Sequence, residues 1–131
     1  MPLNADDRMQ ILELIARYNR AHDSDDTEGW LDTFTDDAVF VTSSSTNEGR
    51  RGLRDFFVDG GERIPGVRHV TYNSVIEAVD GDPDRARMQS DLIVLRAGQP
   101  PEFLLTGSYD DTLRRSEDGW RFERREVRRD A

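Results

Sequence analysis

Apolar residues recur every three or four positions over residues 5–22, and charged residues fill most of the gaps. This spacing predicts an amphipathic helix over 5–22, with acidic residues in its first turn, where the helix dipole favours them. The run DSDD at 23–26 interrupts the pattern. Thr27 is then the expected cap of a short second helix over 27–34. A third helix is expected over 51–61, ending at a double glycine.

The second half of the chain changes to the apolar and polar alternation of strands. A short strand is expected over 38–42, followed by a turn-rich loop. Four long strands joined by tight turns come next, over 67–79, 86–98, 102–115 and 120–129. Short connections favour an antiparallel meander, and helices followed by strands indicate the α+β class. No linker, repeat or low-complexity segment divides residues 1–131, which predicts one domain.

Alternation also predicts which side chains share a face of each strand. On the first long strand, one face is expected to hold His69, Thr71, Asn73 and Val75. The opposite face is expected to hold Arg68, Val70, Tyr72 and Ile76. On the second long strand, the less charged face carries Met88, Ser90, Leu92 and Val94. A curved sheet wrapped around one helix would turn one such face onto a cavity, where unpaired polar groups cost free energy.

Composition narrows the classes of function. The 131 residues carry a formal net charge of −9, which opposes binding to nucleic acid or anionic membranes. The absence of cysteine excludes disulfides, thiolate zinc sites and cysteine nucleophiles, and two histidines cannot form a three-histidine metal site. No phosphate-binding glycine loop or nucleophile elbow is present, so neither a metal nor a cofactor is expected. The N-terminus lacks signal-peptide features and no apolar run approaches ~20 residues, so a cytoplasmic location is expected.

Two positions could carry proton-transfer chemistry. Asp23 follows the first helix, where it belongs either to a solvated acidic loop or, if it turns inward, to a site as a general base. His69 is either a hydrogen-bonded core residue or a group that exchanges protons near neutral pH. If the two meet, the aspartate would fix the imidazole tautomer and make the other ring nitrogen more basic.

The last strand is rich in arginine, and only one parity of a strand can point inward. An inward arginine could hold a substrate oxygen or a leaving anion. Most of these residues are expected to form solvated ion pairs, which contribute little each. The arginines concerned are Arg121, Arg124, Arg125, Arg128 and Arg129.

Several segments, in this order, resemble the SnoaL-like branch of the nuclear-transport-factor-2-like superfamily over nearly the whole chain. The segments are IARYNRAHDSDDTEGWLDTFTDDAVF, EGRRGLRDFF, RHVTYNSVIEAVDGDPDRARMQS and TGSYDDTLRRSEDGWRFERREV. The resemblance implies a cone in which three N-terminal helices pack on a strongly curved, mixed or antiparallel sheet. It leaves function open, because this fold hosts several enzyme classes and also non-catalytic subunits.

Within this branch the chain looks most like scytalone dehydratase and the hexachlorocyclohexane dehydrochlorinase, which use an aspartate–histidine dyad. Asp23 matches the family aspartate, His69 the family histidine, and Arg125 a functional arginine of the dehydrochlorinase. His22 replaces a tyrosine of the dehydratase, and Tyr18 replaces a lysine of the dehydrochlorinase. A second pocket histidine has no counterpart, and Met88 or Ser90 lies in that region. The substrate therefore does not carry over.

The resemblance implies a cofactor-independent lyase or isomerase for a small apolar or hydroxy-carbonyl compound, with loss of water from a hydroxy-carbonyl compound as the favoured reaction. His69 would be the base and Asp23 its orienting partner. The groups that polarise a carbonyl or receive the leaving group would come from Tyr18, His22, Asn73 and Arg125. A polyketide-type cyclase or an epoxide hydrolase is an alternative on the same fold. So is a non-catalytic ligand-binding or accessory subunit.

The open face of the sheet is expected to carry apolar patches at Val70, Tyr72 and Ile76. Members of this superfamily are commonly joined through that face. A homodimer or homotrimer is therefore expected.

Overall fold

The computed structural model describes residues 3–60 and 64–131. Its helices are α1 (Ala5–Asp23), α2 (Thr27–Leu31) and α3 (Gly49–Asp59). The two shorter strands of the first half are β1 (Phe34–Val41) and β2 (Thr46–Glu48). The long strands are β3 (Val67–Val79), β4 (Asp82–Arg96), β5 (Glu102–Ser116) and β6 (Gly119–Arg129).

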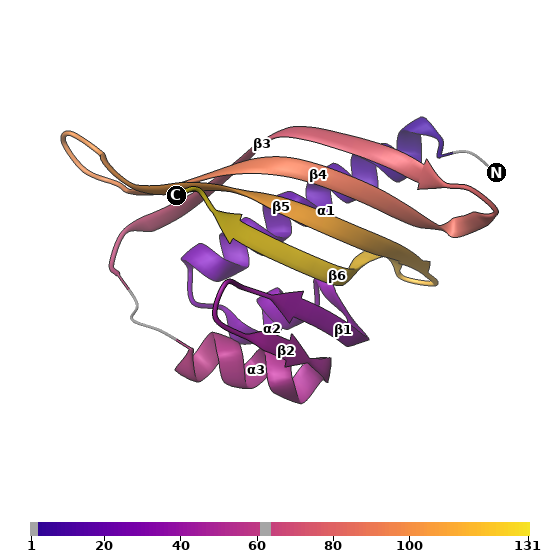
Figure 1. Ribbon diagram of the computed structural model, residues 1–131, viewed down its shortest axis with the longest axis horizontal. Coiled ribbons are helices and arrows are strands. Elements are labelled where there is room, and N and C mark those ends of the chain that lie inside the picture. Colours follow the sequence, from indigo (N-terminus) through magenta and orange to yellow (C-terminus); the bar gives the residue numbers. More distant parts are fainter. Residues whose placement is uncertain (1–2, 61–63) are drawn as a thin grey trace.

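All these strands form one sheet in the order β2-β1-β6-β5-β4-β3. β3 to β6 are antiparallel neighbours, which confirms the predicted meander. β1 pairs parallel to β6 and antiparallel to β2, so the sheet is mixed. Figure 1 shows α1 crossing behind the curved long strands, while α2 and α3 lie beside β1 and β2. The α+β cone expected from the resemblance is confirmed.

The start of α1 is fixed by a reciprocal cap. The Asp7 backbone N–H donates to the Asn4 side chain (2.8 Å), and the Asn4 backbone N–H donates to the Asp7 carboxylate (3.1 Å). Asp7 also accepts from Arg115 Nη1 at 2.6 Å and from Trp120 Nε1 at 3.1 Å. Burial alone would raise the pKa of Asp7, but these hydrogen bonds and the Arg115 charge together lower it. The helix is thereby anchored to β5 and β6.

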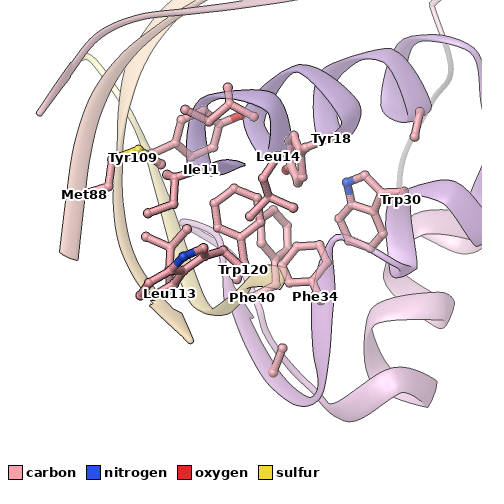
Figure 2. Packing of buried hydrophobic residues seen from close by; sticks show 14 of the residues in the cluster. Ile11, Leu14, Tyr18, Trp30, Phe34, Phe40, Met88, Tyr109, Leu113 and Trp120 are labelled. Atoms are coloured by element: carbon pink, nitrogen blue, oxygen red, sulfur yellow. The ribbon is translucent and has the colours of Figure 1, made fainter. Parts of the chain in front are cut away.

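The core fills the space between α1 and the inner face of the sheet (Figure 2). Apolar side chains of α1 pack there against large side chains from β1, β4, β5 and β6. Each fully buried large side chain contributes about 1.5–3 kcal/mol relative to exposure. The less charged face of β4 turns inward as expected, since Met88, Ser90, Leu92 and Val94 are all buried. The residues labelled in Figure 2 are Ile11, Leu14, Tyr18, Trp30, Phe34, Phe40, Met88, Tyr109, Leu113 and Trp120.

The predicted boundaries of the first half need correction. Asp26, not Thr27, caps α2, because its Oδ1 accepts from the Gly29 N–H at 3.0 Å. α2 stops at Leu31, and Phe34 already begins β1 instead of ending a helix. The predicted loop after β1 contains β2, whose three residues pair with β1.

Other differences are small shifts at the ends of elements. α3 runs from Gly49 to Asp59, and the second glycine of its predicted stop, Gly61, lies outside the described residues. β4 begins at Asp82, because the turn after β3 is limited to Asp80 and Gly81. Gly81 has a φ of 76°, which suits glycine in so tight a turn.

A bulge at Asn73 overturns the predicted faces of β3. Asn73 has a φ of 54°, and the pairing with β4 shifts between Tyr72 and Val75. The extra residue reverses the alternation, so Ile76 turns into the core while Val75 is 58% exposed. The prediction that Asn73 and Val75 share a face with His69 was wrong, as was the outward placement of Ile76. Asparagine tolerates this left-handed conformation better than most residues.

Candidate active site

A sharp turn between α1 and α2 aims Asp23 at the sheet. Asp25 adopts a left-handed conformation with a φ of 59°. The Asp26 backbone N–H donates back to the Ala21 carbonyl at 2.8 Å. The chain therefore reverses directly after α1, which leaves the Asp23 carboxylate against β3. Its side chain is 21% exposed, so Asp23 is not part of a freely solvated loop.

Asp23 contacts His69 through both the ring and the backbone. The distance between His69 Nδ1 and Asp23 Oδ1 is 2.6 Å. The His69 backbone N–H donates to Asp23 Oδ2 at 3.0 Å and to Oδ1 at 3.2 Å. β3 is an edge strand, so this N–H has no neighbouring strand to bind on that side. The carboxylate supplies the missing acceptor and fixes the imidazole in the same interaction.

This geometry selects one imidazole tautomer. An ionised carboxylate can only accept hydrogen bonds, so the proton of neutral His69 lies on Nδ1. Nε2 then carries the lone pair. A carboxylate on Nδ1 also stabilises the imidazolium that forms when Nε2 takes a proton. His69 therefore has the arrangement of a general base held by an aspartate.

Asp23 and His69 line a cavity of about 770 Å³, within the usual range for small-molecule sites. Its walls come from the end of α1, from α3, from the segment before β3, and from β3, β4, β5 and β6. Among the described residues, most of the lining is apolar and five lining residues are polar or charged. The apolar lining residues are Phe56, Phe57, Ile64, Pro65, Val67, Val94, Leu104 and Leu105. The charged or polar ones are His22, Asp23, Asp25, His69 and Arg129.

His22 is the third predicted residue that lines this cavity. Its ring lies almost parallel to that of His69, with centroids 4.1 Å apart and planes inclined by 32°. The His22 ring also contacts an aromatic ring of α3, because the His22 and Phe57 ring centroids are 5.5 Å apart. The imidazoles of His22 and His69 and the carboxylate of Asp23 thus converge at one end of a mostly apolar cavity.

Tyr18 and Arg125 lie deeper, in a sealed cluster. The Arg125 guanidinium is 3.4 Å from the Tyr109 ring centroid and 4.2 Å from that of Tyr18. Its Nε lies 3.2 Å from Asp111 Oδ1, and both side chains are 0% exposed. Burial raises the pKa of Tyr18, against the opposing charge of Arg125. Neither Tyr18 nor Arg125 lines the described cavity.

The other three predicted ligand contacts are also placed elsewhere. Asn73 lies on the outer side of the bulge, where its Nδ2 donates to Asp91 Oδ2 at 3.0 Å. Met88 is buried in the core, and the Ser90 hydroxyl lies 2.9 Å from that of Ser74. None of the three lines the described cavity. The structure therefore brings Asp23, His69 and His22 together and separates the remaining predicted residues from them.

Sequence reasoning missed most of the cavity wall. Phe56 and Phe57 were assigned to a helix without a function, and both line the cavity. Arg129 was one of five arginines in the last strand, and a bulge between Phe122 and Arg124 resets which of them point inward. The useful signal was the doubled aromatic pair, which is more apolar surface than one face of a short helix needs. For Arg129 the sequence held no comparable signal.

Within residues 3–60 and 64–131, no group of three or more histidine, aspartate or glutamate side chains is placed to hold a metal ion. None of the helices in these ranges is long and apolar enough to cross a bilayer.

Known proteins resemble this chain both in sequence family and in fold. The model of the SnoaL-like domain family matches residues 4–126. No curated protein sequence matches the chain. A protein of unknown function with a cystatin-like fold, from Nostoc punctiforme PCC 73102, is 28% identical with a TM-score of 0.89. That match covers 99% of this chain and 96% of the other.

Two structures from Novosphingobium aromaticivorans are also similar. A candidate aromatic ring hydroxylase is 28% identical with a TM-score of 0.83, and the match covers 97% of this chain and 91% of the other. A candidate scytalone dehydratase is 23% identical with a TM-score of 0.81, covering 95% of this chain and 84% of the other. At that identity the dehydratase is evidence for the fold alone.

Proposed function

The chain belongs to the SnoaL-like domain family of the nuclear-transport-factor-2-like superfamily, and we propose that it is a cofactor-independent lyase or isomerase. Its substrate would be a small, largely apolar hydroxy-carbonyl compound. The observation that carries the proposal is the 2.6 Å contact between Asp23 and His69 at one end of an apolar cavity. This arrangement meets the geometric requirement for a base with an oriented imidazole.

The reaction needs no external redox partner. His69 Nε2 takes the proton from the carbon next to the carbonyl, and the C–H electrons form an enolate. The electrons then form the carbon–carbon double bond as the β-hydroxyl leaves. The imidazolium returns its proton to the departing hydroxyl, so water is released and His69 is restored. In an isomerisation the same proton returns to a different carbon.

The enolate oxygen needs a hydrogen-bond donor. The positions of the side chains reduce the number of predicted residues that could supply one. The sequence suggested Tyr18, His22, Asn73 and Arg125 for this role. Of these four, His22 lines the cavity. We assign it the role of donating to the carbonyl oxygen, because its ring lies against His69.

The proposal is tested by hydrogen–deuterium exchange, which detects proton abstraction whatever the leaving group. The protein is incubated in D₂O with 3-hydroxy-1-phenylpropan-1-one, and deuterium at the α-carbon and loss of water are followed by NMR. The wild-type protein should accelerate α-exchange over buffer, and His69→Ala should lower that rate by ~10²–10⁴-fold. Val75→Ala is the matched control, because Val75 lies on the same strand but on its outer face.

Three outcomes separate the alternatives. Exchange without loss of water would favour an isomerase. Exchange followed by ring closure on a longer polyketide-like ketone would favour a cyclase. Binding of the ketone with equal exchange in wild type and His69→Ala would reject catalysis and favour a non-catalytic ligand-binding subunit.

A homo-oligomer through the outer face of the sheet is a further part of the proposal. Val70 and Tyr72 are 39% and 37% exposed on this face, and Ile76, now placed in the core, does not contribute. Charges of both signs flank the apolar area, including Asp91 and Arg128, so a second copy can complement it. Light scattering should give a mass above 15.0 kDa for the wild type. Tyr72→Arg should lower that mass to the monomer value.

A further inference from the structure

The cavity carries opposite charges at its two ends. His69 lies on β3 and Arg129 on β6, with β4 and β5 between them. Three strand spacings of ~4.8 Å separate the backbones of the two residues by ~14 Å. This distance does not include the side chains. Asp23 is next to His69, whereas Arg129 lines the cavity from the other side. Among the described residues, a ligand that spans the cavity therefore has the Asp23 carboxylate beside one end and the Arg129 guanidinium beside the other.

Arg129 differs from the arginines beside it. Arg124 and Arg128 both bind Glu126, at 3.2 Å and 2.8 Å. Arg125 faces Asp111 in the core. Within the described ranges the Arg129 guanidinium makes no hydrogen bond and no ion pair, although it lines the cavity. Its donors are thus available to a ligand.

The wall between the two ends is apolar. Val94 lies opposite His69 on β4, and Leu105 lies opposite Val94 on β5. Leu105 is two residues from Gly107, which pairs with Arg129. A continuous apolar strip therefore leads from the imidazole of His69 to the guanidinium of Arg129. Such a strip fits an unsubstituted hydrocarbon body better than a polar chain.

We propose that the cavity selects apolar compounds bearing a carboxylate, which Arg129 holds while the reacting carbon lies beside His69. This inference rests on the proposed function for the position of the reacting carbon, but the preference for an anion does not. The planar guanidinium matches a carboxylate with two parallel hydrogen bonds. Asp23 repels an anion from the His69 end, so the ligand binds in one orientation.

The net charge of −9 does not oppose this binding strongly. Most of the acidic groups are on the surface, and their fields are screened over ~8 Å at physiological ionic strength. A contact with Arg129 acts at hydrogen-bond distance and is less affected. The preference should therefore weaken with added salt without disappearing.

The test compares 2-naphthoate with the neutral and similarly shaped 2-naphthamide by titration calorimetry. The wild-type protein should bind the naphthoate about tenfold more tightly, equivalent to about 1.4 kcal/mol. Arg129→Gln should abolish this difference by weakening the naphthoate about tenfold and leaving the naphthamide unchanged. Arg128→Gln is the matched control, because Arg128 is also an exposed arginine of β6 but pairs with Glu126 and does not line the cavity.

Two results would overturn the inference: equal affinity of the wild type for both probes, or an unchanged naphthoate preference in Arg129→Gln. Failure of both probes to bind at millimolar concentration also counts against it. The His69→Ala variant separates the two proposals, since it should keep the naphthoate preference while losing α-exchange. A preference without exchange in the wild type would leave this inference standing and reject the lyase.

Discussion

Asp23–His69 and Asp111–Arg125 are both acid–base pairs within one cone, yet their surroundings differ. The first pair is hydrogen-bonded at 2.6 Å and borders an open cavity. The second is fully buried between aromatic rings, and its 3.2 Å contact lacks hydrogen-bond geometry. Burial raises the pKa of Asp111 to about 7, although the Arg125 charge opposes this rise.

The comparison shows that a carboxylate beside a base does not by itself identify a catalytic site. Access to a ligand and a hydrogen bond that fixes one tautomer distinguish the open pair. The sealed pair has no access to a ligand and no such hydrogen bond. Its charges are therefore expected to affect the stability of the fold and not a reaction. The two pairs should therefore respond to mutation in opposite ways, one in activity and the other in stability.

The largest expected effect on stability comes from removing one charge of the sealed pair. Asp111→Leu leaves the Arg125 cation buried without a counter-charge, which should cost about 3–5 kcal/mol of unfolding free energy. Arg125→Met should cost less, because Asp111 can take up a proton whereas an arginine cannot lose one. Urea unfolding at pH 8 measures both.

The double variant Asp111→Leu/Arg125→Met is the control for this prediction. Replacing a buried pair by apolar groups of similar volume is often neutral or stabilising. The double variant should thus be more stable than Asp111→Leu. If it is the least stable of the three, Arg125 and Asp111 stabilise the fold jointly and the comparison fails.

An intermediate effect is expected from pH. The pKa of Asp111 is about 7 in the folded state and 3.8 ordinarily, so the folded state holds the extra proton between these values. The unfolding free energy should therefore rise as pH falls from 8 to 5, by on the order of 2 kcal/mol. Asp111→Asn should remove this dependence. Asp7 has a lowered pKa and acts in the opposite sense, but only below its ordinary pKa of 3.8.

The smallest effect on stability should come from the open pair. Asp23→Asn keeps an acceptor for the His69 backbone N–H and should cost about 0.5–1.5 kcal/mol. The same variant removes the carboxylate that stabilises the imidazolium, so α-exchange should fall by ~10²–10⁴-fold. Urea unfolding and the exchange assay are measured on one preparation. A large loss of stability with unchanged exchange would make Asp23 a structural residue.

Periodicity predicted the regular elements well because each depends on its own residues. α1 was predicted over 5–22 and runs Ala5–Asp23, since its apolar stripe and acidic first turn are local features. The faces of β4 were also predicted. β2 was missed because its three residues have no apolar alternation and become a strand only through pairing with β1.

The candidate site was predicted in part, for a similar reason. Asp23 and His69 were predicted from their residue types and positions and then matched to a family, but nothing local shows that residues 46 positions apart meet. The bulges at Asn73 and after Phe122 each depend on how neighbouring strands pair. They moved Asn73 away from the cavity and allowed Arg129 to line it, which simple alternation cannot foresee.

The bond from the His69 backbone to Asp23 has a consequence for interpreting relatives of this protein. The carboxylate binds one outward N–H of the β3 edge, a group that would otherwise be open to pairing with another chain. A relative without the proposed chemistry would still satisfy this N–H by keeping the aspartate. Retention of the aspartate therefore does not separate this structural role from the proposed catalytic one. The imidazole has no such second use, so under the proposed function its presence or loss is the better guide to whether a relative shares the chemistry.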